Sequence, residues 1–335
     1  MQESMVILMF NIAIVGATGL VGSTFLKIIE EYDIKFDQLR LFASSKSKGK
    51  VIIFKGKEYL IEEITKGCFE GIDYVLFSAG GAISLKYAKQ ATNEGAIVID
   101  NSSAWRMDPN VPLVVPEVNI EDACNQKLIA NPNCSTIQVV LPLSTLEETY
   151  GIESVRYTTY QAVSGSGING INELKKTRNG EENSFYQYNI NETCIPQIDV
   201  FLEDGYTKEE QKMIDETKKI LHNSKIKINA TCVRVPIMNC HAVSVNVVLK
   251  ENYDLKDIYQ LFDKQVGLVV KDDFSNNIYP VATEAEGTDS VYIGRIRKDK
   301  INEKGILFYT VADNIRKGAA SNAVQIMIAL EKEVR

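Results

Sequence analysis

A cysteine, Cys134, is the residue best placed for chemistry, in the stretch ANPNCSTIQ. An Asn-Pro-Asn turn precedes it and an apolar run follows it, so the pattern predicts that Cys134 opens a helix. Backbone N–H groups and the positive dipole end at a helix N-terminus favour a thiolate and also suit an oxyanion. Cys134 is therefore interpreted as a nucleophile, with a buried structural cysteine as the alternative. Pro142, about two turns further on, should kink or end this helix.

The chain has two histidines that could act as an acid or base beside the thiol, His222 and His241. His222 lies near the end of a polar helical stretch, where a cation beside the helix C-terminus is the simple explanation. His241 starts the β-rich run HAVSVNVVLK, seven residues after Arg234. Because the free pKa of histidine lies nearest to neutral pH, Cys134 and His241 form a plausible pair, although the residues alone leave this open.

A glycine-rich stretch, GATGLVG, follows one predicted strand and opens a predicted helix. Its glycines permit a tight turn, close approach of the backbone to a pyrophosphate, and packing of helix on strand. The residues expected to contact a dinucleotide here are Gly16, Thr18, Gly19, Leu20, Val21 and Gly22. A plain strand-to-helix turn is the alternative interpretation.

Two further stretches belong to the same expected cleft. FSAGGAIS follows another strand and places small residues at its carboxyl end, namely Ser78, Ala79, Gly80 and Gly81. LFASSKSKGK ends the second strand with hydroxyls and a cation instead of the Asp or Glu typical of NAD binding: Ser44, Ser45, Lys46 and Ser47. These groups suit a 2′-phosphate, so NADP(H) is the predicted cofactor, with a solvated basic loop as the alternative.

The elements that must position these residues alternate between strands and helices from about residue 11 to residue 130. This rhythm predicts a Rossmann-type doubly wound parallel sheet, interrupted by a hairpin about Lys55-Gly56. After Cys134 the strands become long and consecutive, which predicts a second α+β domain on a mixed sheet. The last segment has helical spacing of Ala323, Ile326, Met327 and Leu330, and we expect it to pack back on the first domain.

Composition limits the alternatives. With 335 residues, 45% hydrophobic and 24% charged, the chain is long enough for two globular domains. A net charge of −7 gives no basic surface for nucleic acid or an anionic membrane. The six cysteines form no C-x-x-C pair, so we expect no disulfide framework, no metal site and a reducing, cytoplasmic location. The apolar N-terminal stretch is too short to span a bilayer, and the residues before Met9 have no evident role.

Six motifs, in order along nearly the whole chain, resemble the aspartate-β-semialdehyde dehydrogenase family: FNIAIVGATGLVG, DNSSAWR, NPNCSTIQ, YQAVSGSG, RVPIMNCH and DNIRKGAASNAVQ. The resemblance implies an NADP-binding domain of residues 1–132 and 315–335, and a catalytic and dimerisation domain of residues 133–314. It also implies a homodimer or homotetramer that makes aspartate semialdehyde for lysine, threonine and methionine (diaminopimelate) biosynthesis.

The resemblance assigns roles to individual residues. Cys134 would be the nucleophile, His241 the acid/base catalyst and Gln161 the residue that orients the reacting group. The expected substrate ligands are Arg234 for the carboxylate, Glu216 for the amino group, Arg106 and Lys219 for phosphate, and Asn133 beside the cysteine. The residues expected near the nicotinamide are Ser164, Gly165 and Asn314. Taken alone, Arg106, Glu216 and Lys219 would read as solvated surface charges.

One departure concerns Cys240, which precedes His241 where a small residue such as glycine is expected. Its side chain could crowd the pocket or add a second oxidisable thiol. Two alternatives to the dehydrogenase remain. N-acetyl-γ-glutamyl-phosphate reductase shares the domain plan and the chemistry, but its acylated substrate gives Glu216 no ammonium to bind. A non-catalytic NADP(H)-binding relative would need none of Cys134, Gln161, Arg234 and His241. The role of the loop from Asn179 to Asp199 is left open.

Overall fold

A computed structural model of the chain describes residues 9–333. They divide into two units. Unit 1 comprises the described residues of Met1–Pro116, Ile120–Asn131 and Ala320–Arg335. Unit 2 comprises Glu117–Asn119 and Pro132–Ala319, so it includes residues 315–319, which we had expected in the cofactor-binding domain. The segment before Met9 lies outside the described residues.

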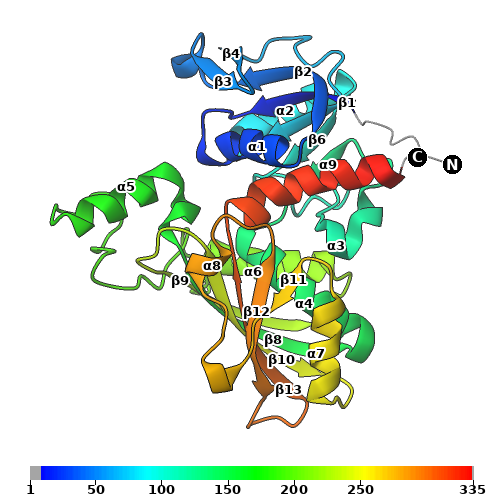
Figure 1. The fold of residues 1–335 in the computed structure, drawn as a ribbon, viewed down its shortest axis with the longest axis vertical. Helices are drawn as coiled ribbons and strands as arrows, with labels where there is room; N and C mark the ends of the chain where they lie inside the picture. Colours follow the sequence, from blue (N-terminus) through cyan, green and yellow to red (C-terminus); the bar gives the residue numbers. More distant parts are fainter. Residues whose placement is uncertain (1–8, 334–335) are drawn as a thin grey trace. The chain divides into compact units, whose positions relative to one another are not determined.

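Unit 1 is built on a seven-stranded sheet with the order β3-β4-β2-β1-β5-β6-β7 (Figure 1). Its strands are β1 (Met9–Val15), β2 (Lys35–Phe42), β3 (Val51–Phe54), β4 (Lys57–Glu62), β5 (Tyr74–Phe77), β6 (Ile97–Asp100) and β7 (Leu128–Ala130). Its helices are α1 (Leu20–Glu31), α2 (Gly81–Asn93) and α9 (Ser321–Glu333), and α3 (Pro116–Asn119) lies where the units divide. All neighbours except β3 and β4 pair in parallel, as the alternating sequence pattern predicted.

The β3–β4 pair is the predicted hairpin. Its turn residues, Lys55 and Gly56, have φ angles of 47° and 74°. Positive φ at both positions fits the right-handed twist of a two-residue hairpin, and glycine adopts it without strain.

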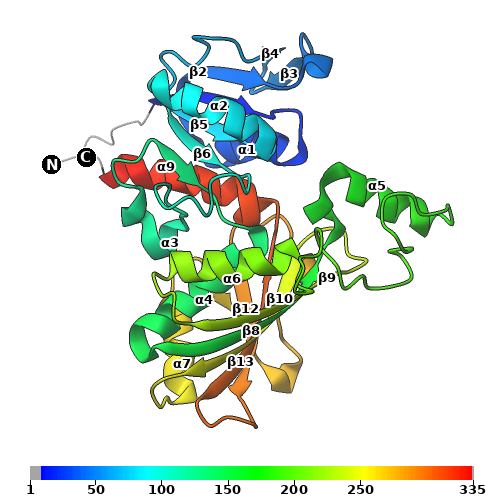
Figure 2. The same cartoon turned by 180° about the vertical axis from the view of Figure 1, so that it is seen from behind.

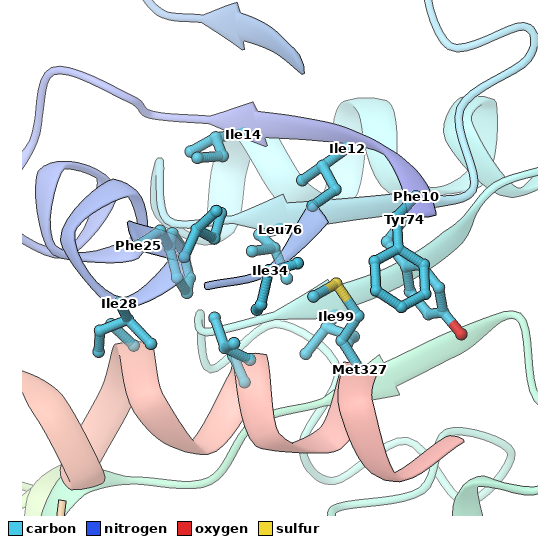
Figure 3. Close-up of a cluster of buried hydrophobic side chains, with 14 of the residues drawn as sticks. Phe10, Ile12, Ile14, Phe25, Ile28, Ile34, Tyr74, Leu76, Ile99 and Met327 are labelled. Carbon is cyan, nitrogen blue, oxygen red and sulfur yellow. The ribbon is translucent and has the colours of Figure 1, made fainter. Parts of the chain in front are cut away.

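The core of unit 1 lies between the sheet and the helices α1 and α9. Alternate residues of β1, among them Ile12 and Ile14, point to this side and meet Phe25 and Ile28 of α1 (Figure 3). Met327 enters the same cluster from α9, with Ala323, Ile326 and Leu330 also buried. The spacing seen in the sequence thus forms the buried stripe of an amphipathic helix.

Unit 2 is built on a six-stranded mixed sheet with the order β11-β12-β13-β10-β8-β9. Its strands are β8 (Ile152–Gln161), β9 (Lys227–Arg234), β10 (His241–Leu249), β11 (Leu268–Val270), β12 (Val291–Lys298) and β13 (Gly305–Ala312). Its helices are α4 (Cys134–Tyr150), α5 (Gly167–Arg178), α6 (Lys208–Ile220), α7 (Leu255–Lys264) and α8 (Ala282–Ala285). Figures 1 and 2 show α5 and the segment after it extending away from this sheet.

Helix α4 decides one of the two effects expected of Pro142, because it does not end at this residue but continues to Tyr150. Proline removes one intrahelical hydrogen bond, which is costly in an isolated helix. Here ten consecutive residues, Ser135 to Ser144, are buried. Tertiary packing on both sides of the proline therefore outweighs the local loss.

A buried ion pair holds the end of unit 2. Lys317, which is fully buried in the π-helical turn Arg316–Ala320, donates to both carboxylate oxygens of Glu117 at 2.6 and 2.8 Å. Arg316 in the same turn forms a two-pronged contact with Asp289, at 2.9 Å to each oxygen. These pairs fix the turn that precedes α9. Among residues 9–333, no helix is long and apolar enough to cross a membrane.

Candidate active site

The cleft expected to bind a dinucleotide lies in unit 1, at the carboxyl ends of the neighbouring strands β1 and β5. The chain continues from β1 to β2 and from β5 to β6, and β2 and β6 lie on opposite sides of this pair of strands. Gly16 has a φ of 90°, and a Cβ built there would lie 2.9 Å from the backbone of Ser78 at the end of β5. A Cβ on Gly22 would lie 2.1 Å from the Gly16 carbonyl oxygen. Only glycine fits at either position, so the backbone forms the close-packed turn that the sequence pattern predicted.

Two helix N-termini border this cleft without side-chain caps. Gly19 precedes α1 and Gly80 precedes α2, and the first turn of each helix has no acidic residue. Uncapped N–H groups with a positive dipole end suit the phosphates of a dinucleotide. The residues present therefore fit the predicted cofactor.

A pocket of about 600 Å³ collects about half of the predicted cofactor residues of unit 1. From the predicted set it contains Gly16, Thr18, Gly19, Ser44, Ser45, Ser78 and Ala79. Leu20, Val21, Gly22, Lys46, Ser47, Gly80 and Gly81 do not line it. Glu63, Thr65, Ile83 and Tyr87 do line it, although no pattern in the sequence pointed to them.

In unit 2, Cys134 is the first residue of α4 and is partly exposed, whereas the residues after it are buried. Asn133 caps the helix, because its Oδ1 accepts from Ser135 N at 2.9 Å and from Thr136 N at 3.3 Å. Burial raises the pKa of three other thiols, those of Cys68, Cys232 and Cys240, and this keeps them protonated. The predicted setting of Cys134 at a helix N-terminus is therefore present.

Helix α6 holds Asn133 from the other side. A capping box starts this helix, in which Thr207 Oγ1 accepts from Glu210 N and Glu210 accepts from Thr207 N. A spacing of seven residues places Glu209 and Glu216 on one buried face. Glu216 Oε2 accepts from Asn133 N at 2.6 Å, and Glu209 Oε1 accepts from Asn133 Nδ2 at 2.8 Å. Lys219 follows Glu216 by three residues and is partly exposed.

His241, at the start of β10, has an orientation set by the backbone. Its Nδ1 accepts from Ala162 N at 3.0 Å, so the neutral ring carries its proton on Nε2. The Nε2 atom is buried and has no hydrogen-bond partner among the described residues. Burial, followed by the charge of Arg234, lowers the pKa of His241 well below its ordinary value. His241 is thus a neutral side chain whose Nε2–H has a proton to donate.

Arg234, at the end of β9, is a buried cation with a side chain fixed by one carbonyl. It is 4% exposed, and its Nη1 donates to Ala162 O at 2.6 Å. No carboxylate of the described residues pairs with it. A Cβ on Gly165 would lie 2.8 Å from Arg234 Nη1 and 3.0 Å from His241 Nε2. Gly165 therefore lies directly against both side chains.

The remaining predicted residues are divided between the two units. Gln161 ends β8 and donates to Glu209 Oε1 at 3.2 Å, and Ser164 and Asn314 are hydrogen-bonded to each other. Arg106 belongs to unit 1, where its buried guanidinium donates to Asn131 O at 2.9 Å and to Asn101 O at 2.8 Å. Hydrogen bonds and close contacts in unit 2 thus form two groups. Glu209 joins Asn133 and Gln161, with Glu216 also bonded to Asn133, and the second group consists of Gly165, Arg234 and His241.

The Cys240 side chain, which we expected could crowd the pocket, lies in a small apolar cluster. Its φ is 69°, which explains why glycine suits this position, and its side chain packs against Ala285 and Val311. Its backbone N–H donates to Asn314 Oδ1 at 2.9 Å. The side chain therefore does not crowd the pocket.

Sequence reasoning missed three residues near Cys134. A Cβ on Gly318 would lie 2.9 Å from Cys134 Cβ, so this glycine packs on the cysteine. Gln138, one helical turn after Cys134, has a buried amide without a partner in the described part of the chain. Glu209 joins Asn133 to Gln161. The first two occur in motifs quoted above, but their spacing carries no distinct chemical pattern.

The two units correspond to the two domains of one class of proteins, the semialdehyde dehydrogenases. The family "Semialdehyde dehydrogenase, NAD binding domain" matches residues 11–126, and "Semialdehyde dehydrogenase, dimerisation domain" matches residues 143–317. The chain is 50% identical to aspartate-semialdehyde dehydrogenase of Aquifex aeolicus, with 97% of this chain and 98% of the relative covered. It is 44% identical to the Bacillus subtilis enzyme of the same name, with 96% and 97% covered.

Solved structures show the same similarity. Aspartate semialdehyde dehydrogenase II from Vibrio cholerae has a TM-score of 0.93 at 42% identity, with 98% of this chain and 100% of that chain covered. The same values hold for its complex with ASA. The chain belongs to the aspartate-semialdehyde dehydrogenase family. The resemblance and the fold class inferred from the sequence are therefore confirmed.

The lowered pKa of His241 makes a prediction about stability and pH. The unfolded chain takes up a proton on this histidine near pH 6.5, whereas the folded chain does not, so the wild type should lose stability as the pH falls below 6.5. His241→Gln removes this loss, so the difference between the two proteins should change by at most about 1.4 kcal/mol per pH unit. Thermal unfolding at pH 7.5, 6.5 and 5.5 measures it.

The control is His222→Gln, at an exposed histidine after α6. This variant measures the change in stability that comes from replacing a histidine outside the site. Parallel pH profiles for wild type and His241→Gln would contradict the burial argument.

Proposed function

We propose that the chain catalyses the reversible, phosphate-dependent oxidation of aspartate β-semialdehyde with NADP, which in biosynthesis runs as the reduction of β-aspartyl phosphate. The observation that supports this substrate most directly is Arg234, a buried guanidinium with no carboxylate partner among the described residues. A buried unpaired cation is costly unless a ligand supplies the anion. The α-carboxylate of the substrate would supply it.

Cys134 acts as the nucleophile in this proposal. Its thiolate, stabilised at the start of α4, attacks the acyl carbon and the phosphate leaves, which gives a thioester on Cys134. When bound, the nicotinamide supplies the hydride that reduces this thioester. The Nε2–H of His241 donates a hydrogen bond that stabilises the oxygen that becomes negative, and Gln161 orients the reacting group. As the carbonyl re-forms, the C–S bond breaks, Cys134 leaves as the thiolate and the semialdehyde is released. The reduction is thus divided into two easier steps.

The charged residues account for the other substrate groups. Glu216 uses one oxygen for Asn133 N, and we assign its carboxylate charge to the substrate ammonium. Arg106 and Lys219 are assigned to the phosphate. An acylated substrate, as in N-acetyl-γ-glutamyl-phosphate reductase, has no ammonium for Glu216. The buried acid therefore favours the free amino acid.

NADP is proposed over NAD because of the residues after β2. Ser44 and Ser45 line the pocket, and the adjacent Lys46 is exposed and forms no ion pair within residues 9–333. Lys48, in contrast, pairs with Glu63 at 2.7 Å. Lys46 is thus available for a 2′-phosphate.

The partners proposed are the small-molecule substrates and further copies of the chain, in a homodimer or a homotetramer in the cytoplasm. The match to a dimerisation domain supports assembly through unit 2. Sedimentation of the purified protein distinguishes the two sizes.

The test of the function is an assay of NADPH absorbance with aspartate semialdehyde and NADP, with phosphate present and then omitted. Absorbance that grows only with phosphate supports the substrate, the cofactor and the thioester route together. Activity with N-acetylglutamate semialdehyde instead would reject the substrate and keep the chemistry. No activity with either aldehyde would favour a binding protein.

Cys134→Ala should lower kcat by at least about a thousandfold, since no other group can carry the acyl intermediate. The affinity for NADPH, measured by fluorescence titration, should stay close to that of the wild type. Cys240→Ala is the matched control and should keep the wild-type kcat. Substantial turnover by Cys134→Ala would remove Cys134 from the nucleophile's role.

Arg234→Lys should raise the KM for aspartate semialdehyde by about tenfold to a hundredfold, because an ammonium cannot form the two-pronged contact of a guanidinium with a carboxylate. Initial rates at saturating NADP and phosphate give this KM. An unchanged KM would mean that the substrate carboxylate binds elsewhere.

Lys46→Ala should weaken NADP binding by about tenfold, the effect of losing one charge-assisted contact, without weakening NAD binding. Titration of both dinucleotides into the variant measures this, with Lys50→Ala as the control at an exposed lysine of the same loop. Equal losses for NADP and NAD would contradict the assignment of Lys46 to the 2′-phosphate.

A further inference from the structure

A buried carboxylate outside the predicted site, that of Glu209, contacts two of its residues. Glu209 lies in the first turn of α6 and is 6% exposed. Its Oε1 accepts from Asn133 Nδ2 at 2.8 Å and from Gln161 Nε2 at 3.2 Å. Asn133 precedes α4 and Gln161 ends β8, so one oxygen atom joins two separate elements.

Glu209 carries its negative charge at neutral pH. Burial raises the pKa of this carboxyl, but Lys212 and the two amides lower it by more, so that it lies below its ordinary value. Lys212 Nζ is 3.1 Å from Glu209 Oε2 and 2.8 Å from Asp199 Oδ2. An ionised carboxylate only accepts hydrogen bonds. Both amides must therefore turn their NH₂ groups toward Glu209.

This requirement fixes the helix cap. With Nδ2 of Asn133 on Glu209, Oδ1 faces the N–H groups of Ser135 and Thr136. A reversed amide would place its oxygen against the carboxylate and its NH₂ against these N–H donors. Both contacts would be repulsive. Glu209 thus determines which atom of Asn133 caps the helix that begins with Cys134.

The same requirement fixes Gln161. With Nε2 on Glu209, Oε1 accepts from Thr159 Oγ1 at 3.0 Å. Thr159 Oγ1 in turn accepts from Val233 N at 3.3 Å, so its proton is directed to Gln161. Each donor and acceptor in this series of hydrogen bonds has one orientation, and the series ends at the Glu209 carboxylate.

We propose that Glu209 is a positioning residue of the reaction, which fixes the two amides that frame the Cys134 thiol and the reacting acyl group, and that it does not bind the substrate. The proposal rests on the proposed function for Cys134, Asn133 and Gln161. It gives different roles to two buried acids of α6, because Glu216 is assigned to the substrate and Glu209 to the protein alone.

The variant Glu209→Gln tests whether the charge is needed. Its amide oxygen should turn to the ammonium of Lys212, which leaves its NH₂ facing the NH₂ groups of Asn133 and Gln161. Those two amides should then turn over, and the cap on Ser135 N should be lost. We expect kcat to fall by about tenfold to a hundredfold, with KM and NADPH affinity changed less than about threefold, since positioning affects mainly the chemical step.

A double variant provides rescue. In E209Q/K212M no ammonium holds the oxygen of the introduced amide, so this oxygen can turn back to the amides of Asn133 and Gln161. We expect kcat to recover to within about fivefold of the wild type. Glu210→Gln is the matched control, because Glu210 is also buried in the first turn of α6 but bonds Thr207 N and Cys232 N. It should lower the melting temperature and leave kcat within about twofold of the wild type.

The outcomes are distinct. Wild-type kcat in E209Q, equal losses of kcat in E209Q and E210Q, or no recovery in E209Q/K212M would each overturn the proposal. An inactive wild type would instead reject the proposed function. A crystal structure of E209Q then tests the positioning without a substrate: the Asn133 side chain should have left Ser135 N, and an unchanged cap would overturn the proposal.

Discussion

The cap that Asn133 places on α4 is the interaction on which the organisation of unit 2 depends. Its backbone and side chain bond Glu216 and Glu209, two acids on one face of α6. Through Glu209 the same contacts reach Gln161 at the end of β8. Buried polar groups are stable only when every partner is present, so these elements hold one another in a single arrangement. The thiol at the start of α4 inherits its position from all of them.

Arg234 is a buried charge that no carboxylate within residues 9–333 neutralises. It lies against Gly165 beside the neutral His241, whereas Glu209 of α6 pairs with Lys212. A folded chain that buries unmatched charge gives up stability that a salt bridge or an apolar side chain would restore. The loss is explained if the carboxylate of a bound ligand pairs with Arg234. Pairing of buried polar groups discriminates between ligands more strongly than the size of the pocket does. A ligand that leaves such a group without a partner binds more weakly.

The sequence predicted what local patterns control. The strand-to-helix rhythm, the glycine turn after β1, and Cys134 at a helix start all follow from neighbouring residues. Prediction from the sequence failed where contacts between residues far apart in the chain determine the structure. Pro142 stays inside α4 because packing on both sides compensates for it. Glu209 was missed because its partners lie 76 and 48 residues away, and the run KEEQKMIDETKK resembles an ordinary solvated helix. The roles of Arg106 and Lys219 came from family resemblance and not from their own surroundings.

The place of α9 in unit 1 has a consequence for synthesis on the ribosome. The sheet that α9 covers is complete by Ala130, but the helix begins only at Ser321. Nearly all of unit 2 is translated in between, which takes roughly 10 to 40 s at about 5 to 20 residues per second. During that time the apolar side of the sheet, with Ile12 and Leu76, lacks its final cover. The nascent chain therefore presents an unfinished nucleotide-binding unit, with an exposed surface for chaperones, until α9 leaves the exit tunnel.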